Sequence, residues 1–172
     1  IKLNWQNNQF RFTMHSASVG LVSRTISGMT AENNEWNHYA LTFETGSSNF
    51  VLKFYKNGQL AFSRNENANI RDLLPASDGL HLRIGSEHDN SNPLSGALDE
   101  FRYWKSVRSP ENVFNNWFCQ TGGGTNKNDA NVDLGLYFKF NEGITQIQSI
   151  DEVVLDYSGR FNNGKIEGYG SG

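Results

Sequence analysis

The pair Asn57-Gly58 is the feature that most constrains the fold of this chain. It separates two apolar-rich segments, FVLKFYK at residues 50–56 and QLAFS at residues 59–63. Asn and Gly both tolerate positive φ angles, which the two-residue turn of a tight β-hairpin requires. The sequence therefore predicts two antiparallel strands that meet at this turn.

Other segments have the two-residue period of β-strands, with apolar side chains on one face. Besides the hairpin, strands are predicted at residues 9–14, 19–22, 38–44, 80–84, 96–104, 134–140 and 165–167. The chain has no room for the long helical crossovers of a parallel sheet. Roughly nine short strands, with a turn about every ten residues, predict an all-β antiparallel β-sandwich or jelly roll.

One short segment departs from this pattern and predicts a helix. Ser109 is a typical N-cap residue, Pro110 suits the first helical position, and Glu111 places an acid in the first turn. Val113, Phe114 and Trp117 follow as an apolar stripe for one short helix.

Charge and cysteine content exclude several classes of protein. The 15 basic and 18 acidic side chains give a net charge of −3, so phosphate-driven binding of nucleic acid is excluded. No apolar run reaches the ~18 residues of a membrane span, so membrane insertion is not expected. The single Cys119 excludes a disulfide framework and a four-cysteine zinc site. Because the chain begins with Ile1 rather than Met, we expect a piece of a longer protein.

Four motifs in a fixed order carry a resemblance to a known family. They are EWNHYALTF at residues 35–43, YKNGQ at 55–59, LRIG at 82–85 and LSGALDEFRYW at 94–104. In this order they resemble the laminin G-like family, whose domains are concanavalin A-like lectin/glucanase jelly rolls. The resemblance implies the same β-sandwich with one short helix.

The last part of the chain resembles the opening of such a domain. The motifs are LGLYFKFNEG at residues 134–143 and DYSGRFNNGKI at 156–166. The Gly- and Asn-rich residues 121–131 before them have the composition of a flexible linker. The predicted organisation is a sandwich without its usual N-terminal strands at 1–118, a linker at 119–132, and at 133–172 either the opening strands of a second repeat or strands that complete the first.

Catalysis is not expected from the acidic residues. A retaining glycoside hydrolase needs two carboxylates about 5 Å apart. Asp99-Glu100 and Asp151-Glu152 are chain neighbours, and neighbours on a strand point to opposite faces. A glycoside hydrolase is therefore kept only as an unfavoured alternative.

A structural Ca²⁺ ion is the more credible chemistry, because related jelly rolls often hold one. Calcium binds several carboxylate and hydroxyl oxygens. The candidate ligands are Asp99, Glu142, Asp156 and Ser158. The alternative is that Asp156 caps its own turn without a metal.

Sugar recognition needs an exposed aromatic ring beside amide side chains. The candidate ligand-binding residues are Trp5 at a predicted turn edge, Tyr55 beside the hairpin, and the loop amides Asn90 and Asn92. Trp36 and Trp104 occupy framework positions of the motifs, and Trp117 lies on the helix stripe, so these three are predicted in the core.

The resemblance and the composition together predict a non-catalytic recognition or adhesion module of a larger multi-repeat protein. The expected partners are a glycan or other surface ligand and neighbouring repeats of the same chain. The expected location is extracellular, on a cell or on a virion. The alternative class is a purely structural spacer or assembly domain of an extracellular or virion fibre.

Overall fold

The computed structural model describes most of the chain, and its strands pair antiparallel throughout. The described residues are 2–6, 9–16, 20–27, 34–67, 82–87, 91–121, 133–142, 153–160 and 162–166. Their elements are β1 (Lys2–Gln6), β2 (Gln9–Ser16), β3 (Gly20–Ile26), β4 (Tyr39–Thr45), β5 (Phe50–Lys56), β6 (Gln59–Glu66), β7 (Phe101–Trp104), α1 (Pro110–Asn116), β8 (Leu134–Phe138), β9 (Val153–Val154) and β10 (Gly164–Lys165). The predicted all-β class with one short helix is confirmed.

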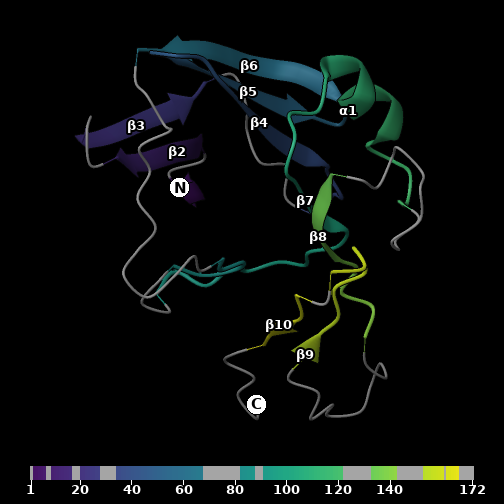
Figure 1. Cartoon of the computed structure of the whole chain (residues 1–172). Coiled ribbons are helices and arrows are strands. Elements are labelled where there is room, and N and C mark those ends of the chain that lie inside the picture. Colours follow the sequence, from purple (N-terminus) through teal and green to yellow (C-terminus); the bar gives the residue numbers. More distant parts are fainter. Residues whose placement is uncertain are drawn as a thin grey trace. The chain divides into compact units, whose positions relative to one another are not determined.

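The chain divides into two compact units, which are coloured along the sequence in Figure 1. The first unit combines Ile1–Leu82 with Val107–Cys119, and the second combines Arg83–Ser106 with Gln120–Gly172. Each unit therefore joins segments that are distant in sequence. Among the described residues, no helix is long and apolar enough to cross a membrane.

The first unit is a sandwich of two three-stranded sheets, in the orders β1-β2-β3 and β4-β5-β6 (Figure 1). Both sheets contribute fully buried side chains to one cluster, and these are Phe12, Met14 and Ile26 from the first sheet with Phe50, Leu52 and Phe54 from the second. Aromatic rings also meet across the layers, with Phe10 and Tyr39 at 4.8 Å between centroids. Burial of these rings is the main force that holds the two sheets together.

The predicted hairpin is confirmed. Lys56 faces Gln59 at the end of the β5–β6 ladder. Between them Asn57 and Gly58 have φ angles of 48° and 77°, the positive values that the two-residue turn requires. The turn therefore fixes the pairing of β5 with β6 next to it, and a bulge between Phe54 and Tyr55 shifts the register of the remaining ladder.

Several strands differ from the prediction. The strand expected at 80–84 is wrong in its described part, because residues 82–84 belong to no strand. The strand β9 was not predicted. The expected strand at 96–104 is wrong in its first half, because β7 begins only at Phe101. Glu100, just before it, has a φ of 55°, which interrupts an extended chain. The strand β1 was not predicted, and it places Trp5 inside a strand rather than at a turn edge.

The predicted helix is confirmed as α1. The Ser109 hydroxyl accepts a hydrogen bond from Asn112 N at 3.1 Å, the expected N-cap contact. Val113 is buried, whereas Phe114 is half exposed, so the apolar stripe is narrower than predicted. The helix packs against β6.

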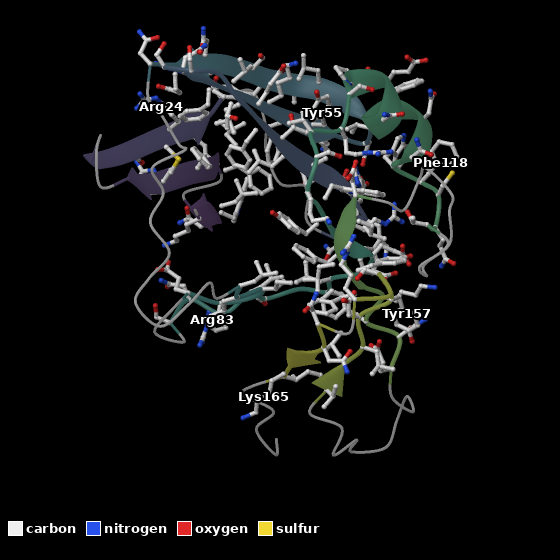
Figure 2. All side chains as sticks on the ribbon, viewed as in Figure 1. Arg24, Tyr55, Arg83, Phe118, Tyr157 and Lys165 are labelled. Carbon is white, nitrogen blue, oxygen red and sulfur yellow. The ribbon has the colours of Figure 1, made fainter. Side chains whose placement is uncertain are left out.

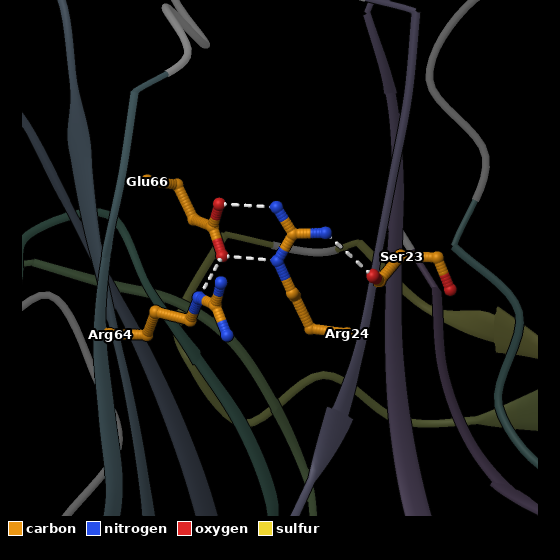
Figure 3. A network of polar contacts seen from close by, with 4 residues as sticks. All are labelled: Ser23, Arg24, Arg64 and Glu66. Carbon is orange, nitrogen blue, oxygen red and sulfur yellow. Dashed lines mark hydrogen bonds and ion pairs between the residues drawn. The ribbon is translucent and has the colours of Figure 1, made fainter.

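A buried carboxylate ties the last strands of the two sheets together (Figure 3). Arg24 of β3 donates from Nε and Nη2 to the two oxygens of Glu66 in β6, at 2.5 and 2.6 Å. Arg64 Nε lies 2.8 Å from Glu66 Oε1. The hydrogen bonds from Arg24 hold the pKa of Glu66 below its ordinary value, against the opposing effect of burial.

The second unit is built around two strand pairs, β7–β8 and β9–β10 (Figure 1). Leu136 and Phe138 of β8 and Val154 of β9 form its buried cluster. Ile84 and Phe101, from the earlier segment of this unit, pack against them. The residues after the predicted linker thus share a core with residues before it.

The substitution Glu66→Gln tests the ionic contact between the sheets. We expect it to lower the free energy of unfolding at neutral pH by about 2 kcal/mol, because two arginines then face a neutral amide. Because the folded-state pKa of Glu66 is lowered, its contribution is present above the ordinary carboxyl pKa and is lost as pH falls through the folded-state value. Urea unfolding at neutral and acidic pH measures both effects.

The control is Glu44→Gln, because that carboxylate is 63% exposed and lies 4.0 Å from Lys53 Nζ. We expect a change below about 0.5 kcal/mol there. Equal losses in the two variants, or a loss in Glu66→Gln that does not shrink in acid, would contradict the assignment.

Candidate functional site

The side chain of Asn57 organises the loop that precedes β4. Asn57 Oδ1 accepts a hydrogen bond from His38 N at 2.8 Å, and Asn57 Nδ2 donates to Asn37 Oδ1 at 3.0 Å. The backbone N of Asn57 donates to His38 O at 2.9 Å. One turn residue thus holds the segment that carries Trp36.

Trp117, at the end of α1, lies directly on the turn. A Cβ atom on Gly58 would stand 2.4 Å from Trp117 Cδ1, so only glycine allows this approach. The Trp117 ring is 6.2 Å from the His38 ring and meets the Phe118 ring edge to face at 5.5 Å. We call Trp36, Asn37, Asn57, Trp117 and Phe118 the hairpin-end cluster.

The prediction that Trp36 lies in the core is wrong, because 72% of its surface is exposed. The residue lies before the first residue of β4, Tyr39, so the inward alternation of that strand does not include it. Phe118, labelled in Figure 2, is 69% exposed. Trp104 and Trp117 are half-buried. Trp36 directly precedes Asn37, whose amide is hydrogen-bonded to Asn57 of the turn.

The predicted ligand-binding residues have different surroundings. Trp5 is half-buried in β1 and packs edge to face on Phe10 at 4.8 Å. Tyr55 is buried in β5, so its ring offers no face to a ligand. The same burial raises the pKa of its hydroxyl.

The two predicted loop amides differ in what the structure describes. Asn92 is exposed and donates from Nδ2 to Glu87 Oε1 at 3.0 Å, whereas Asn90 lies outside the described residues. Ligand binding by Trp5 stays a prediction, whereas the exposed tryptophan is Trp36, and its place before a predicted strand was a usable signal for that exposure.

The predicted calcium ligand Asp156 is occupied by the chain itself. Its Oδ1 accepts hydrogen bonds from Tyr137 N at 3.0 Å and Ser158 N at 2.9 Å. Its Oδ2 accepts from Ser158 Oγ at 2.8 Å and Asn162 N at 3.0 Å. Burial raises the pKa of Asp156, but the hydrogen bonds outweigh burial and hold it below its ordinary value. Four donors fill the positions at which a carboxylate accepts, which favours the turn-capping interpretation.

The other predicted ligands make similar local contacts. Glu142 Oε1 accepts from Leu155 N at 3.2 Å, and Asp99 Oδ1 accepts from Glu100 N at 2.9 Å. In the part of the chain that the structure describes, no three His, Cys, Asp or Glu side chains gather as metal ligands do. Calcium binding stays a prediction, and the observed contacts do not require an ion.

A second polar cluster surrounds Tyr137 in the other unit. Its hydroxyl donates to Glu100 Oε2 at 2.5 Å, and Arg102 Nη2 donates to the same oxygen at 2.6 Å. Arg102 also lies over the Tyr137 ring, 5.2 Å from its centroid. Burial and the bond to Glu100 raise the pKa of Tyr137 to about 12, so the phenol stays neutral at physiological pH. The cluster binds two strands together and leaves Glu100 engaged.

Replacing Asp156 separates a turn cap from a calcium ligand. We expect Asp156→Asn to lower the free energy of unfolding by about 2 kcal/mol, because an amide NH₂ then faces N–H donors. The control Glu142→Gln keeps an oxygen that can accept the single bond from Leu155 N and is expected to change stability by less than about 1 kcal/mol. Thermal unfolding with and without a calcium chelator gives the measurement. If a chelator lowers the Tm of the wild type but not that of Asp156→Asn, the result would support Asp156 as a calcium ligand.

The contact between Trp117 and the turn is tested by Gly58→Ala, with Gly85→Ala as a matched control. Both glycines have positive φ, 77° and 87°, but no atom of the described residues lies within 4 Å of a Cβ on Gly85. The control should cost about 1 kcal/mol of unfolding free energy from backbone strain alone. Gly58→Ala should cost about 2 kcal/mol more, because the indole must move. Equal losses in chemical denaturation would show that Trp117 does not press on the turn.

Comparison with known proteins agrees with this architecture. The family model described as the concanavalin A-like lectin/glucanases superfamily, of the laminin G type, matches residues 1–114. No curated protein and no solved structure matches the chain. The matched residues include the whole β-sandwich of the first unit and the turn on which the hairpin-end cluster is built. The chain therefore belongs to the laminin G-like family of the concanavalin A-like lectin/glucanase superfamily.

Proposed function

We propose that this chain is a non-catalytic recognition module that binds a carbohydrate at its hairpin-end cluster. The family supports a carbohydrate-binding or adhesion-type module. The observation that supports this site is the exposure of Trp36, which directly precedes Asn37 in the chain, together with the hydrogen bond between the Asn37 and Asn57 amides. The apolar face of a sugar ring stacks on an indole, while amides bond its hydroxyl groups.

Preorganisation supports the same proposal. The two hydrogen bonds between Asn57 and the segment at residues 37–38 hold the loop in the absence of ligand. The indole of Trp36 is therefore attached to ordered backbone, and less entropy is lost when a ligand binds. A rigid aromatic side chain on such a support suits a shallow surface site.

A non-catalytic role is favoured over that of a glucanase by the state of the acidic side chains. Glu100 is bound by both Arg102 and Tyr137, and Asp99 by the backbone of its neighbour. A glycosidase needs one carboxyl group free to give up or accept a proton and a second about 5 Å away. Asp151 and Glu152 lie outside the described residues.

The proposed setting is an adhesion module of a longer, multi-repeat protein on a cell or virion surface. Laminin G-like domains are typically extracellular, which supports this setting. A spacer or assembly domain of a fibre is the competing role. That role has no use for an exposed tryptophan beside ordered amides.

A glycan array tests the binding site through Trp36. We expect Trp36→Ala to weaken binding at least about tenfold and Trp36→Phe to weaken it less, because a smaller ring still stacks. Leu98→Ala is the control, since it removes a side chain that is 45% exposed in the other unit. All three variants should unfold within about 0.5 kcal/mol of the wild type, because exposed positions contribute little to stability.

The outcomes separate the alternatives. Absence of binding to every glycan would favour the structural spacer. Equal binding by Trp36→Ala and the wild type would place the site elsewhere. Release of reducing sugar from β-glucans by the wild type would establish a glucanase.

A further inference from the structure

The β7–β8 pair connects two parts of the sequence that the family match separates. Phe101 faces Phe138 and Trp104 faces Leu134, although residues 105–133 lie between the strands. The family match ends at residue 114, so β8 lies outside it and pairs with a strand inside it. A segment that follows the family match thus pairs with a strand that the family match includes.

The side chains of β8 are buried where the strand pairs with β7. Leu134 and Tyr137 are fully buried, and Leu136 and Phe138 are less than 10% exposed. The remaining residue of β8 is Gly135, and a Cβ atom there would stand 2.8 Å from Tyr103 Cδ1 on the facing strand. A strand with large apolar residues around one glycine therefore fits β7 closely.

Polar contacts fix the register of the pair at both of its ends. At one end Tyr137 and Arg102 meet on the Glu100 carboxylate. At the other end Lys105 N donates to Asp133 O at 2.8 Å, and Ser106 Oγ donates to Asp133 Oδ2 at 2.7 Å. A slip by one residue would break all of these contacts and turn the buried side chains outward.

The opposite side of β8 is supported by its own segment. Tyr137 N donates to Asp156 Oδ1 at 3.0 Å, and Tyr157 N donates to Tyr137 O at 2.8 Å. Arg160 Nε donates to Leu134 O at 2.8 Å. Residues 156–160 thus hydrogen-bond to one edge of β8, and the other edge pairs with β7.

The geometry points to a donor–acceptor pair: the β7 edge is a docking site for the β8 segment, and a second copy of this chain can supply that segment. The described contacts between the two strands join residues 100–106 to residues 133–138, so the pairing is made by short segments at the strands themselves. The connection keeps the donor at a high local concentration and so favours the chain's own segment. Once it is cut, the segment of another copy binds the same edge through the same contacts.

The test uses the full chain with a protease site inserted between Gly123 and Gly124, cut after folding. The two fragments are expected to stay together in size-exclusion chromatography. Equal amounts of isotope-labelled and unlabelled cut protein are then mixed, and native mass spectrometry measures the masses of the intact complexes. Free exchange gives hybrid complexes as about half of the total.

A variant of the donor strand shows where the exchange occurs. Labelled cut protein with Gly135→Val should deliver its segment to unlabelled acceptors at least about tenfold less, because the new side chain meets Tyr103. Leu155→Ala is the matched control in the same segment, because its side chain is 44% exposed. Circular dichroism of the uncut variants verifies that both remain folded.

Three outcomes would overturn the inference. Separation of the fragments, with the β-structure of the N-terminal fragment retained, would show that β7 does not hold the β8 segment. Fragments that stay together but never form hybrids would make the segment a permanent part of its own chain. If the segment with Gly135→Val exchanges as readily as the wild-type segment, the surface that receives the segment does not lie on β7.

Discussion

The turn at Asn57-Gly58 is the constraint on which most of the first unit depends. Its positive φ angles bring β5 and β6 together as a hairpin, and the alternation along β5 directs Phe50, Leu52 and Phe54 into the core. The Asn57 side chain then holds the loop before β4. A single turn therefore joins two strands of one sheet and supports the proposed binding surface at its end.

In the second unit, side chains that resemble a functional site serve structure. Asp156 is saturated by donors of its own chain, and Glu100 joins Tyr137 to Arg102. Polar groups that are satisfied in this way add stability and strand specificity, and a substrate or an ion would have to displace their present donors. The candidate site is consequently the place where the exposed Trp36 directly precedes the hydrogen-bonded Asn37.

Several features were predictable because they depend on residues close in sequence. The hairpin, the Ser109 cap and the Asp156 turn each follow from local hydrogen bonds and φ preferences. The exposure of Trp36 was missed, because a motif position suggests a role but not a depth of burial. The burial of Tyr55 was missed as well, because its place beside a turn did not reveal the opposing sheet.

The sequence by itself determined the all-β class, the turn at residues 57–58, the short helix and the family, since these rest on residue types a few positions apart. Only the tertiary structure decided that Arg24 meets Glu66 and that β8 pairs with β7. Both contacts join residues about thirty or more positions apart, and loop-closure entropy opposes them. They form because burial of the surrounding apolar side chains outweighs that entropy, and burial is a property of the assembled fold.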